Sequence, residues 1–273
     1  MDIWLLIQAA IMGLVEGITE FLPISSTGHL ILTAQLLDFW TVEKRELFAV
    51  AVQIGAIAAV IYEYWGKLWG AAIGAVTGEP QGRRLSINLI IASIPIVILG
   101  LTLGDQIKFY LFNATTVAIA LIIGGFIILW AEKRPHQIQA DEVEHISFKH
   151  AVLIGLIQCL ALIPGTSRSG ATIIGGLLMG VSRKAAAEFS FFLGIPVLMG
   201  AGLLDMYKSR HELHSNDMLV LGVGMLVAFV SALLVIRALI RYVSKHDFTI
   251  FAYYRIIFGV VILVTAWTGW IHW

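Results

Sequence analysis

Apolar segments long enough to cross a lipid bilayer alternate with short polar segments along this chain. A crossing helix needs about 20 predominantly apolar residues. Six segments meet that length, at about 47–65, 85–103, 114–131, 187–205, 218–238 and 249–271. The pattern therefore predicts six transmembrane helices, and we interpret the polar segments 66–84, 132–148 and 206–217 as surface loops.

Two further apolar regions are interrupted by polar islands, and each flank is too short to cross a bilayer. Residues 3–15 and 30–37 flank the first island, and residues 150–163 and 173–181 flank the second. Non-helical backbone at membrane depth is tolerated only inside protein or beside a water-filled cavity. We therefore predict two re-entrant helical hairpins within an all-α polytopic membrane protein.

The two halves of the chain resemble each other when the sequence is shifted by 142 residues. This register aligns Ser25 with Ser167 without a gap. Each half would hold one hairpin and three spans, and an odd number of spans inverts the second half in the membrane. We predict one membrane domain over 1–273 with an inverted-topology repeat, whose first unit covers about 2–131 and whose second covers about 144–271.

The overall composition agrees with a membrane protein. Of the 273 residues, 59% are hydrophobic and 13% are charged, and the mean hydropathy is +0.88. Soluble domains usually carry about 25% charged residues. The net charge is zero, so the broad basic surface expected of a nucleic-acid-binding protein is absent and we predict no nucleic-acid partner. The single cysteine, Cys159, excludes an internal disulfide and a cysteine-based metal cage.

Basic residues are unevenly divided between the two sides of the predicted membrane domain. Eleven Lys and Arg residues fall on one side, and five fall on the other, namely Lys44, Arg45, Lys108, Lys208 and Arg210. Cytoplasmic loops carry an excess of Lys and Arg. The richer side is therefore predicted to be cytoplasmic, which makes the first polar loop open from the outer face.

The first polar island begins with two acids, Glu16 and Glu20, four residues apart. On a helix they share one face, where like charges repel and call for a shared proton or a cation. Mg²⁺ and Ca²⁺ prefer carboxylate oxygens. We therefore predict that Glu16 and Glu20 bind a divalent cation, Mg²⁺ or Ca²⁺. The alternative is a pair of helix-end acids wetted at the membrane interface.

The rest of the first island is rich in hydroxyl groups and ends in a histidine. A hydroxyl that attacks phosphorus needs a nearby base. We predict Ser26 as the nucleophile, activated by Glu20 or His29, with His29 also transferring a proton. Ser25 and Thr27 are predicted to bind phosphate, although capping of the next helix would explain any single hydroxyl.

The second island supplies a cation, Arg168, just before a predicted helix. A helix N-terminus and a guanidinium together form a site for phosphate oxygens. We predict that Arg168, Ser167, Ser169 and Thr172 bind substrate phosphate, with Arg168 also catalytic; the alternative role for Arg168 is a structural ion pair with the acids of the first island. Arg255, inside the last span, is expected to bind anionic lipid or to pair with an acid rather than to act in catalysis.

With these residues the chain resembles the undecaprenyl diphosphate phosphatase family, also described as bacitracin-resistance proteins. Residues 16–20 satisfy the family's motif of an acid or amide, three residues and Glu, and residues 23–29 match its serine–histidine stretch. Residues 164–172 match its motif Pro-Gly-x-Ser-Arg-Ser-x-x-Thr. The resemblance implies hydrolysis of undecaprenyl diphosphate to undecaprenyl phosphate and inorganic phosphate, which recycles the lipid carrier for peptidoglycan synthesis. It also implies a divalent-cation requirement and a bacterial inner-membrane location.

A second class of function fits the same architecture. An inverted-repeat transporter or flippase would bind an anionic lipid without hydrolysing it. Binding an anion alone does not require two nearby carboxylates, which would repel the ligand, and this favours the enzyme. The residues alone do not decide whether Ser26, His29 or a water molecule is the nucleophile. They also leave open the metal, the lipid chain length and the oligomeric state, a homo-oligomer included.

Overall fold

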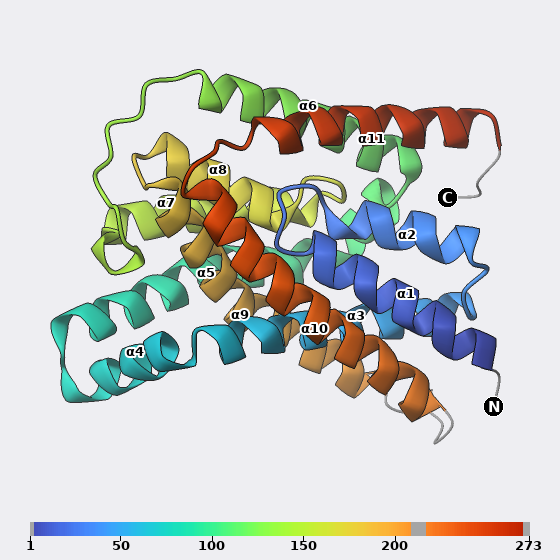
Figure 1. Cartoon of the computed structure of the whole chain (residues 1–273), viewed down its shortest axis with the longest axis horizontal. Helices are drawn as coiled ribbons and strands as arrows, with labels where there is room; N and C mark the ends of the chain where they lie inside the picture. The colour runs from blue at the N-terminus through green and yellow to red at the C-terminus, as the bar shows by residue number, and fades with distance from the viewer. Residues whose placement is uncertain (1–2, 209–216, 270–273) are drawn as a thin grey trace.

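The structure, a computed structural model, describes residues 3–208 and 217–269 (Figure 1). The end of the span expected at 249–271 and the outermost residues of both expected repeat units lie outside the described residues. So do part of the expected loop at 206–217 and the basic residue Arg210.

Helices account for most of the described chain. The first half contains α1 (Ile3–Thr19), α2 (Ser26–Leu36), α3 (Val42–Glu63), α4 (Trp65–Thr77), α5 (Pro80–Leu111) and α6 (Ala114–Glu132). The second half contains α7 (Phe148–Gln158), α8 (Arg168–Leu178), α9 (Arg183–Lys208), α10 (Asp217–Val243) and α11 (Thr249–Trp267). Two 3₁₀ turns, Val143–His145 and Cys159–Leu162, precede and follow α7. The described residues contain no β-strand beyond one isolated bridge, so the protein is all-α.

Six of these helices are long and apolar enough to cross a membrane. Within the described residues they cover Lys44–Glu63, Pro80–Leu111, Ala114–Glu132, Arg183–Tyr207, Asp217–Val243 and Thr249–Trp267. Each one coincides with a predicted span. The prediction of an all-α polytopic membrane protein with six transmembrane helices is therefore confirmed.

The shorter apolar helices flank the two polar islands. α1 packs against α2, and α7 packs against α8, with a loop joining each pair (Figure 1). α1 has 17 residues and each of the other three has 11, so they are short for a bilayer. α1 continues to Thr19 and α2 begins at Ser26, so the first polar loop is shorter than the sequence indicated.

The interpretation of residues 66–84 as a surface loop is wrong. Most of this segment forms α4 and the first turn of α5. Gly78, in a left-handed conformation, ends α4, and Pro80 opens α5 with Glu79 capping its N-terminus through hydrogen bonds from two backbone N–H groups. The Gly and Pro that suggested a loop therefore mark a tight junction between two helices.

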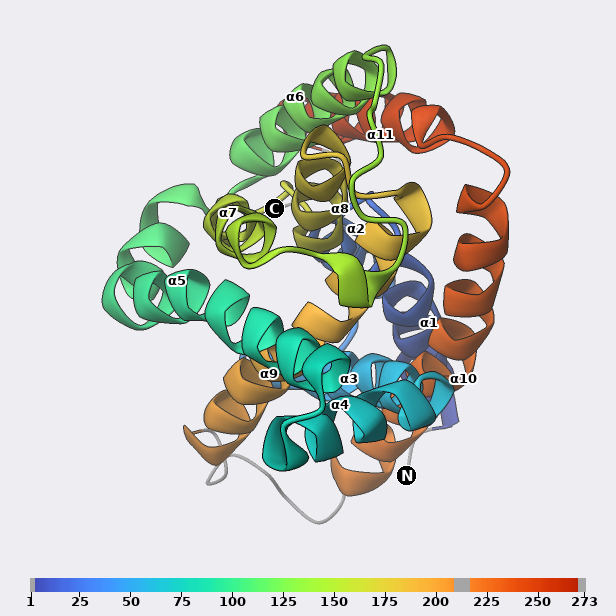
Figure 2. The same ribbon diagram turned by 90° about the vertical axis from the view of Figure 1, so that its left-hand side faces the viewer.

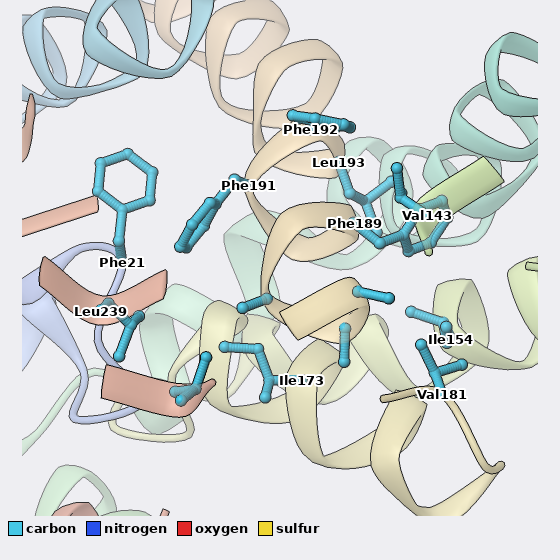
Figure 3. Close-up of a cluster of buried hydrophobic side chains, with 14 of the residues drawn as sticks. Phe21, Val143, Ile154, Ile173, Val181, Phe189, Phe191, Phe192, Leu193 and Leu239 are labelled. Carbon is cyan, nitrogen blue, oxygen red and sulfur yellow. The ribbon is translucent and has the colours of Figure 1, made fainter. Parts of the chain in front are cut away.

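The centre of the protein is built on the first half of α9. Every residue from 185 to 194 is buried, whichever way its side chain points. Phe189, Phe191, Phe192 and Leu193 point into surrounding helices, and Phe191 meets Phe21 of the first polar loop edge to face at 5.3 Å (Figure 3). A helix that is apolar all round is a buried helix. α9 therefore supports both polar loops from within.

Glycines allow the shorter helices to approach the long ones closely. α1 packs on α10, and α7 packs on α5. A Cβ at Gly13 would lie 2.3 Å from the Gly224 carbonyl oxygen of α10, and a Cβ at Gly155 would lie 2.6 Å from the Ala92 carbonyl oxygen of α5. Backbone thus contacts backbone at both interfaces, which leaves no room for a side chain.

Replacing Gly13 by Ala should destabilise the protein, because the added methyl group would force α1 away from α10. Overpacking of this kind costs about 1–3 kcal/mol. We expect a lower midpoint of thermal unfolding for Gly13→Ala in detergent. Gly222→Ala, also on the α1–α10 pair, is the matched control, since a Cβ there meets nothing within 4 Å. Equal midpoints for the two variants would contradict this packing.

Candidate active site

The two polar loops meet in the middle of the protein through a buried ion pair. Arg168, the first residue of α8, donates from Nη2 to Glu20 Oε1 at 3.1 Å. The two side chains are only 7% and 6% exposed. Arg168 Nη1 also donates to the Ser190 carbonyl oxygen of α9 at 2.8 Å. The structure therefore brings the acidic island and the basic island into direct contact.

Glu20 also binds the serine predicted as the nucleophile. Ser26 Oγ donates to Glu20 Oε2 at 2.7 Å. One carboxylate thus accepts from a hydroxyl on one oxygen and from a guanidinium on the other. A carboxylate in this position can take up the hydroxyl proton, so Glu20 can act as the base for Ser26.

An unusual backbone conformation precedes each of these two side chains. Ser25 has φ 69° and Ser167 has φ 70°, in the left-handed region that non-glycine residues rarely adopt. The next residues, Ser26 and Arg168, each begin a helix. Backbone held in such a conformation is often found at functional sites. Here it turns the chain so that Ser26 and Arg168 both line one cavity.

That cavity has a volume of about 130 Å³. Its polar wall comes from both islands, and its apolar wall comes from the segment before α8 and from α9. The polar lining residues are Glu20, Ser25, Ser26, Thr27, Gln53, Ser167 and Arg168. Arg168 Nε, which is buried, has no hydrogen-bond partner in the described part of the chain. The cavity is therefore lined by hydroxyl groups and by a guanidinium, both of which can bind an anion.

The five hydroxyl residues predicted to bind phosphate fall into two groups. Ser25, Thr27 and Ser167 line the cavity. Ser169 and Thr172 do not line it and instead hold the site together. Ser169 Oγ donates to the Leu22 carbonyl oxygen of the first loop at 2.8 Å.

Thr172 connects α8 to α9. Its Oγ1 donates to Ser190 Oγ at 2.7 Å and lies 2.9 Å from the carbonyl oxygen of Arg168, one turn back. Because the Ser190 carbonyl also accepts a hydrogen bond from Arg168 Nη1, this contact supports the position of Arg168. The structure thus gives Thr172 a supporting contact rather than a place in the cavity.

His29 lies on the side of the first loop that faces α11. Its Nδ1 donates to the Ser25 carbonyl oxygen at 2.7 Å, and its Nε2 lies 2.7 Å from the Tyr254 hydroxyl. Its ring stacks on Phe258 at 4.0 Å between centroids. Both ring nitrogens have hydrogen-bond partners and neither contacts Ser26, so the acceptor beside the Ser26 hydroxyl is Glu20 and not His29.

Glu16 is fully buried, and both of its carboxylate oxygens lack a hydrogen-bond partner among the described residues. It is therefore not an acid wetted at the membrane interface. A buried carboxylate without a partner is costly unless it holds a proton or a cation. Glu16 and the neighbouring Glu20 thus fit a divalent cation, although no group of three His, Cys, Asp or Glu residues is gathered anywhere in the described ranges.

Several residues of the site escaped the sequence analysis. Gln53 of α3 lines the cavity. Ser190 holds Arg168, and Tyr254 holds His29. Arg255 donates to four carbonyl oxygens and is 1% exposed, so it does not reach lipid. A lone Ser, Gln or Arg within an apolar helix was the only available signal, and it does not identify the partner.

The fold and the site together define an integral membrane protein with a buried polar centre, in which a serine hydroxyl, a carboxylate and a guanidinium are hydrogen-bonded. Residues 9–261 match the family described as bacitracin resistance protein BacA, and the chain belongs to that family.

Close relatives match over nearly their full length. The chain is 65% identical to undecaprenyl-diphosphatase 1 of Acinetobacter baylyi, with all of both chains covered. It is 62% identical to undecaprenyl-diphosphatase of Psychrobacter cryohalolentis, covering 98% of this chain and 97% of that one. It is 56% identical to undecaprenyl-diphosphatase 2 of Rhodospirillum rubrum, covering 100% and 99%.

Replacing Thr172 by Val should reduce stability, because the buried Ser190 hydroxyl would lose its partner. Leaving such a group unsatisfied costs about 1–3 kcal/mol. Thr172→Ser, which keeps the hydroxyl, should lose less. Thermal unfolding of both variants in detergent measures the difference. If Thr172→Val unfolds at the wild-type temperature, the contact with Ser190 is not a support.

Proposed function

We propose that this protein is an integral membrane phosphatase that hydrolyses undecaprenyl diphosphate to undecaprenyl phosphate and inorganic phosphate. Relatives at 53–65% identity over the full chain carry the name undecaprenyl-diphosphatase. The family resemblance adds the role, which is recycling of the lipid carrier for cell-wall synthesis. The substrate partner is therefore a polyprenyl diphosphate lipid.

One observation carries the chemistry, namely the position of Glu20 between Ser26 and Arg168. Ser26 Oγ attacks the terminal phosphorus while its proton passes to Glu20 Oε2. The bond from phosphorus to the bridging oxygen breaks, and undecaprenyl phosphate leaves. Glu20 gives the serine proton to the departing undecaprenyl phosphate; water then attacks the phosphoserine, its proton passes to Glu20 and on to Ser26 Oγ, and inorganic phosphate is released. The Ser26 hydroxyl is restored in this second step.

Arg168 stabilises the charge on the transferred group. Phosphoryl transfer depends mainly on positioning and on neutralising charge at the equatorial oxygens. Arg168 Nη1 and Nη2 are held by Ser190 and Glu20, which leaves Nε–H available to a phosphate oxygen. Ser25, Thr27 and Ser167 supply further donors along the same cavity.

Glu16 and Glu20 are the residues that would hold a divalent cation, Mg²⁺ or Ca²⁺. Such an ion, when bound, neutralises the two carboxylates and the phosphate oxygens. Its support is the buried, unpartnered carboxylate of Glu16. Without a cation or a proton there, a dianionic headgroup would meet uncompensated negative charge.

A transporter or flippase for an anionic lipid is the rival function. Binding alone would not require a serine hydroxyl directed at a carboxylate, as Ser26 is at Glu20. The relatives described above are named as phosphatases. The rival is therefore not favoured.

The single domain is proposed to contain two inverted units, at about 2–131 and about 144–271, each with a re-entrant hairpin. The equal φ angles of Ser25 and Ser167 support this division. So does the packing: α1 contacts α10 as α7 contacts α5, and α3 contacts α10 as α9 contacts α5. If α1, α3 and α5 are the repeat equivalents of α7, α9 and α10, then the α1–α10 contact is equivalent to the α7–α5 contact. The α3–α10 contact is likewise equivalent to the α9–α5 contact.

We further propose a bacterial inner-membrane location, with the cavity opening to the outer side. The excess of Lys and Arg on the opposite side supports this orientation. A homo-oligomer is not required for the proposed site, since one chain supplies every cavity-lining residue named above.

Purified protein in detergent should release inorganic phosphate from farnesyl diphosphate, a short polyprenyl diphosphate. Ser26→Ala and Arg168→Ala should each lower release by about 100-fold or more, because a nucleophile and a charge-stabilising group are lost. A chelator should stop release, and added Mg²⁺ or Ca²⁺ should restore it. Phosphate release is measured colorimetrically.

Ser93→Ala is the matched control, because Ser93 is also buried but its hydroxyl bonds only the Leu89 carbonyl of its own helix. Its release should stay near that of the wild type. Near-wild-type release from Arg168→Ala would sink the assignment of the site. Lipid diphosphate binding without release by the wild type would favour the transporter.

The orientation is testable with two cysteines placed at opposite ends of α5. Lys108 and Gln81 are both exposed. In a Cys159→Ser background, an impermeant maleimide added to intact spheroplasts should label Lys108→Cys and not Gln81→Cys. Gln81→Cys should be labelled only after permeabilisation. The reverse pattern would place the cavity mouth on the cytoplasmic side.

A further inference from the structure

Arg255 of α11 is the largest fully buried side chain in the described part of the protein. It is not among the residues that line the cavity, and within the described ranges no carboxylate pairs with it. A buried charge is costly unless hydrogen bonds satisfy it. Its surroundings therefore have to explain why the protein keeps a guanidinium there.

Four backbone carbonyl oxygens surround the guanidinium. Nη1 donates to Pro23 at 3.0 Å, and Nη2 donates to Gly165 at 3.2 Å. Nε donates to Leu121 at 3.2 Å, and Nη2 also donates to Ala120 at 3.1 Å. Pro23 belongs to the first polar loop, Gly165 to the second, and the other two to α6. One side chain therefore fastens both loops to one spanning helix.

The two loop carbonyls lie at the same separation in sequence from Ser26 and from Arg168. Pro23 lies three residues before Ser26, and Gly165 lies three residues before Arg168. Gly165 has φ 92° and a Cβ there would lie 2.3 Å from the Val117 carbonyl oxygen, so the second loop rests directly on α6. By holding these two carbonyls, Arg255 determines where the first loop joins α2 and where the second loop joins α8.

Two glycines lie beside the guanidinium of Arg255. A Cβ at Gly124 of α6 would lie 2.1 Å from Arg255 Nη2. A Cβ at Gly170 of α8 would lie 3.0 Å from Nη1. The guanidinium thus lies close to the backbone at both glycines, and an added methyl group at Gly124 would displace it.

We propose that Arg255 is a positioning residue for phosphate transfer. It holds the two polar loops in register on α6, so that Ser26 and Glu20 of one loop face Arg168 of the other. It acts through these loops and not on the substrate. This inference rests on the proposed phosphatase function.

The test compares variants of the purified protein by steady-state phosphate release from farnesyl diphosphate. Arg255→Met keeps the length of the side chain but removes every donor. A misplacement of about 1 Å can lower a rate by about 100-fold. We expect kcat to fall by about that factor in Arg255→Met, with KM changed by less than about threefold. Arg255→Lys, which keeps the charge but not the fork of donors, should give an intermediate kcat.

Gly124→Ala provides an independent test, since it keeps Arg255 and displaces its head group. Its kcat should fall by about tenfold or more, and it decides the question if Arg255→Met does not fold. In the Arg255→Met background the same change should lower kcat little further. Gly200→Ala, where a Cβ meets nothing within 4 Å, is the matched control and should leave kcat unchanged.

Thermal unfolding and the yield of monodisperse protein separate positioning from stability. A purely structural role would lower these two quantities and leave kcat of the folded protein at the wild-type value, which would overturn the proposal. Wild-type kcat in Arg255→Lys would also overturn it, because charge alone would then suffice. No release by the wild-type protein would reject the proposed function, and this inference with it.

Discussion

The ion pair between Glu20 and Arg168 is the contact on which the site depends, because it joins two loops that are far apart in the sequence. Breaking a buried pair by removing one partner costs about 3–5 kcal/mol. Here each partner is also held by a second contact, Glu20 by Ser26 and Arg168 by Ser190. The pair therefore aligns a hydroxyl, its acceptor and a cation in one hydrogen-bonded chain.

The other helices surround these hydrogen-bonded side chains. α9 passes behind them, and its buried first half supplies the Ser190 carbonyl. The second loop lies between α8 and the 3₁₀ turn Cys159–Leu162 that follows α7, and the first loop lies between α1 and α2 (Figure 2). α6 and α11 lie side by side and cover the outer flank, where Arg255 bonds both loops. Polar backbone at membrane depth is thus enclosed by protein on each side.

The sequence predicted the spans and singled out the candidate site residues because both are signals read along the chain. An apolar run has a countable length, and Glu20, Ser26 and Arg168 stand out against lipid-compatible neighbours. The sequence did not predict which residues contact each other across the fold. His29 meets Tyr254 225 positions away, and Arg255 meets Pro23 232 positions away. Such partners depend on how helices pack, which a single sequence does not encode in any local pattern.

The length of α5 has a consequence for the thickness of the surrounding bilayer. Its 32 residues correspond to about 48 Å of helix, whereas a hydrocarbon core measures about 30 Å. Its first turns, packed against α4, therefore extend into the headgroup layer or α5 leans steeply. A thinner or thicker membrane would change the tilt of this helix pair first. The candidate site residues lie on other helices, and α7 and α9, which pack on α5, connect such a change of tilt to them.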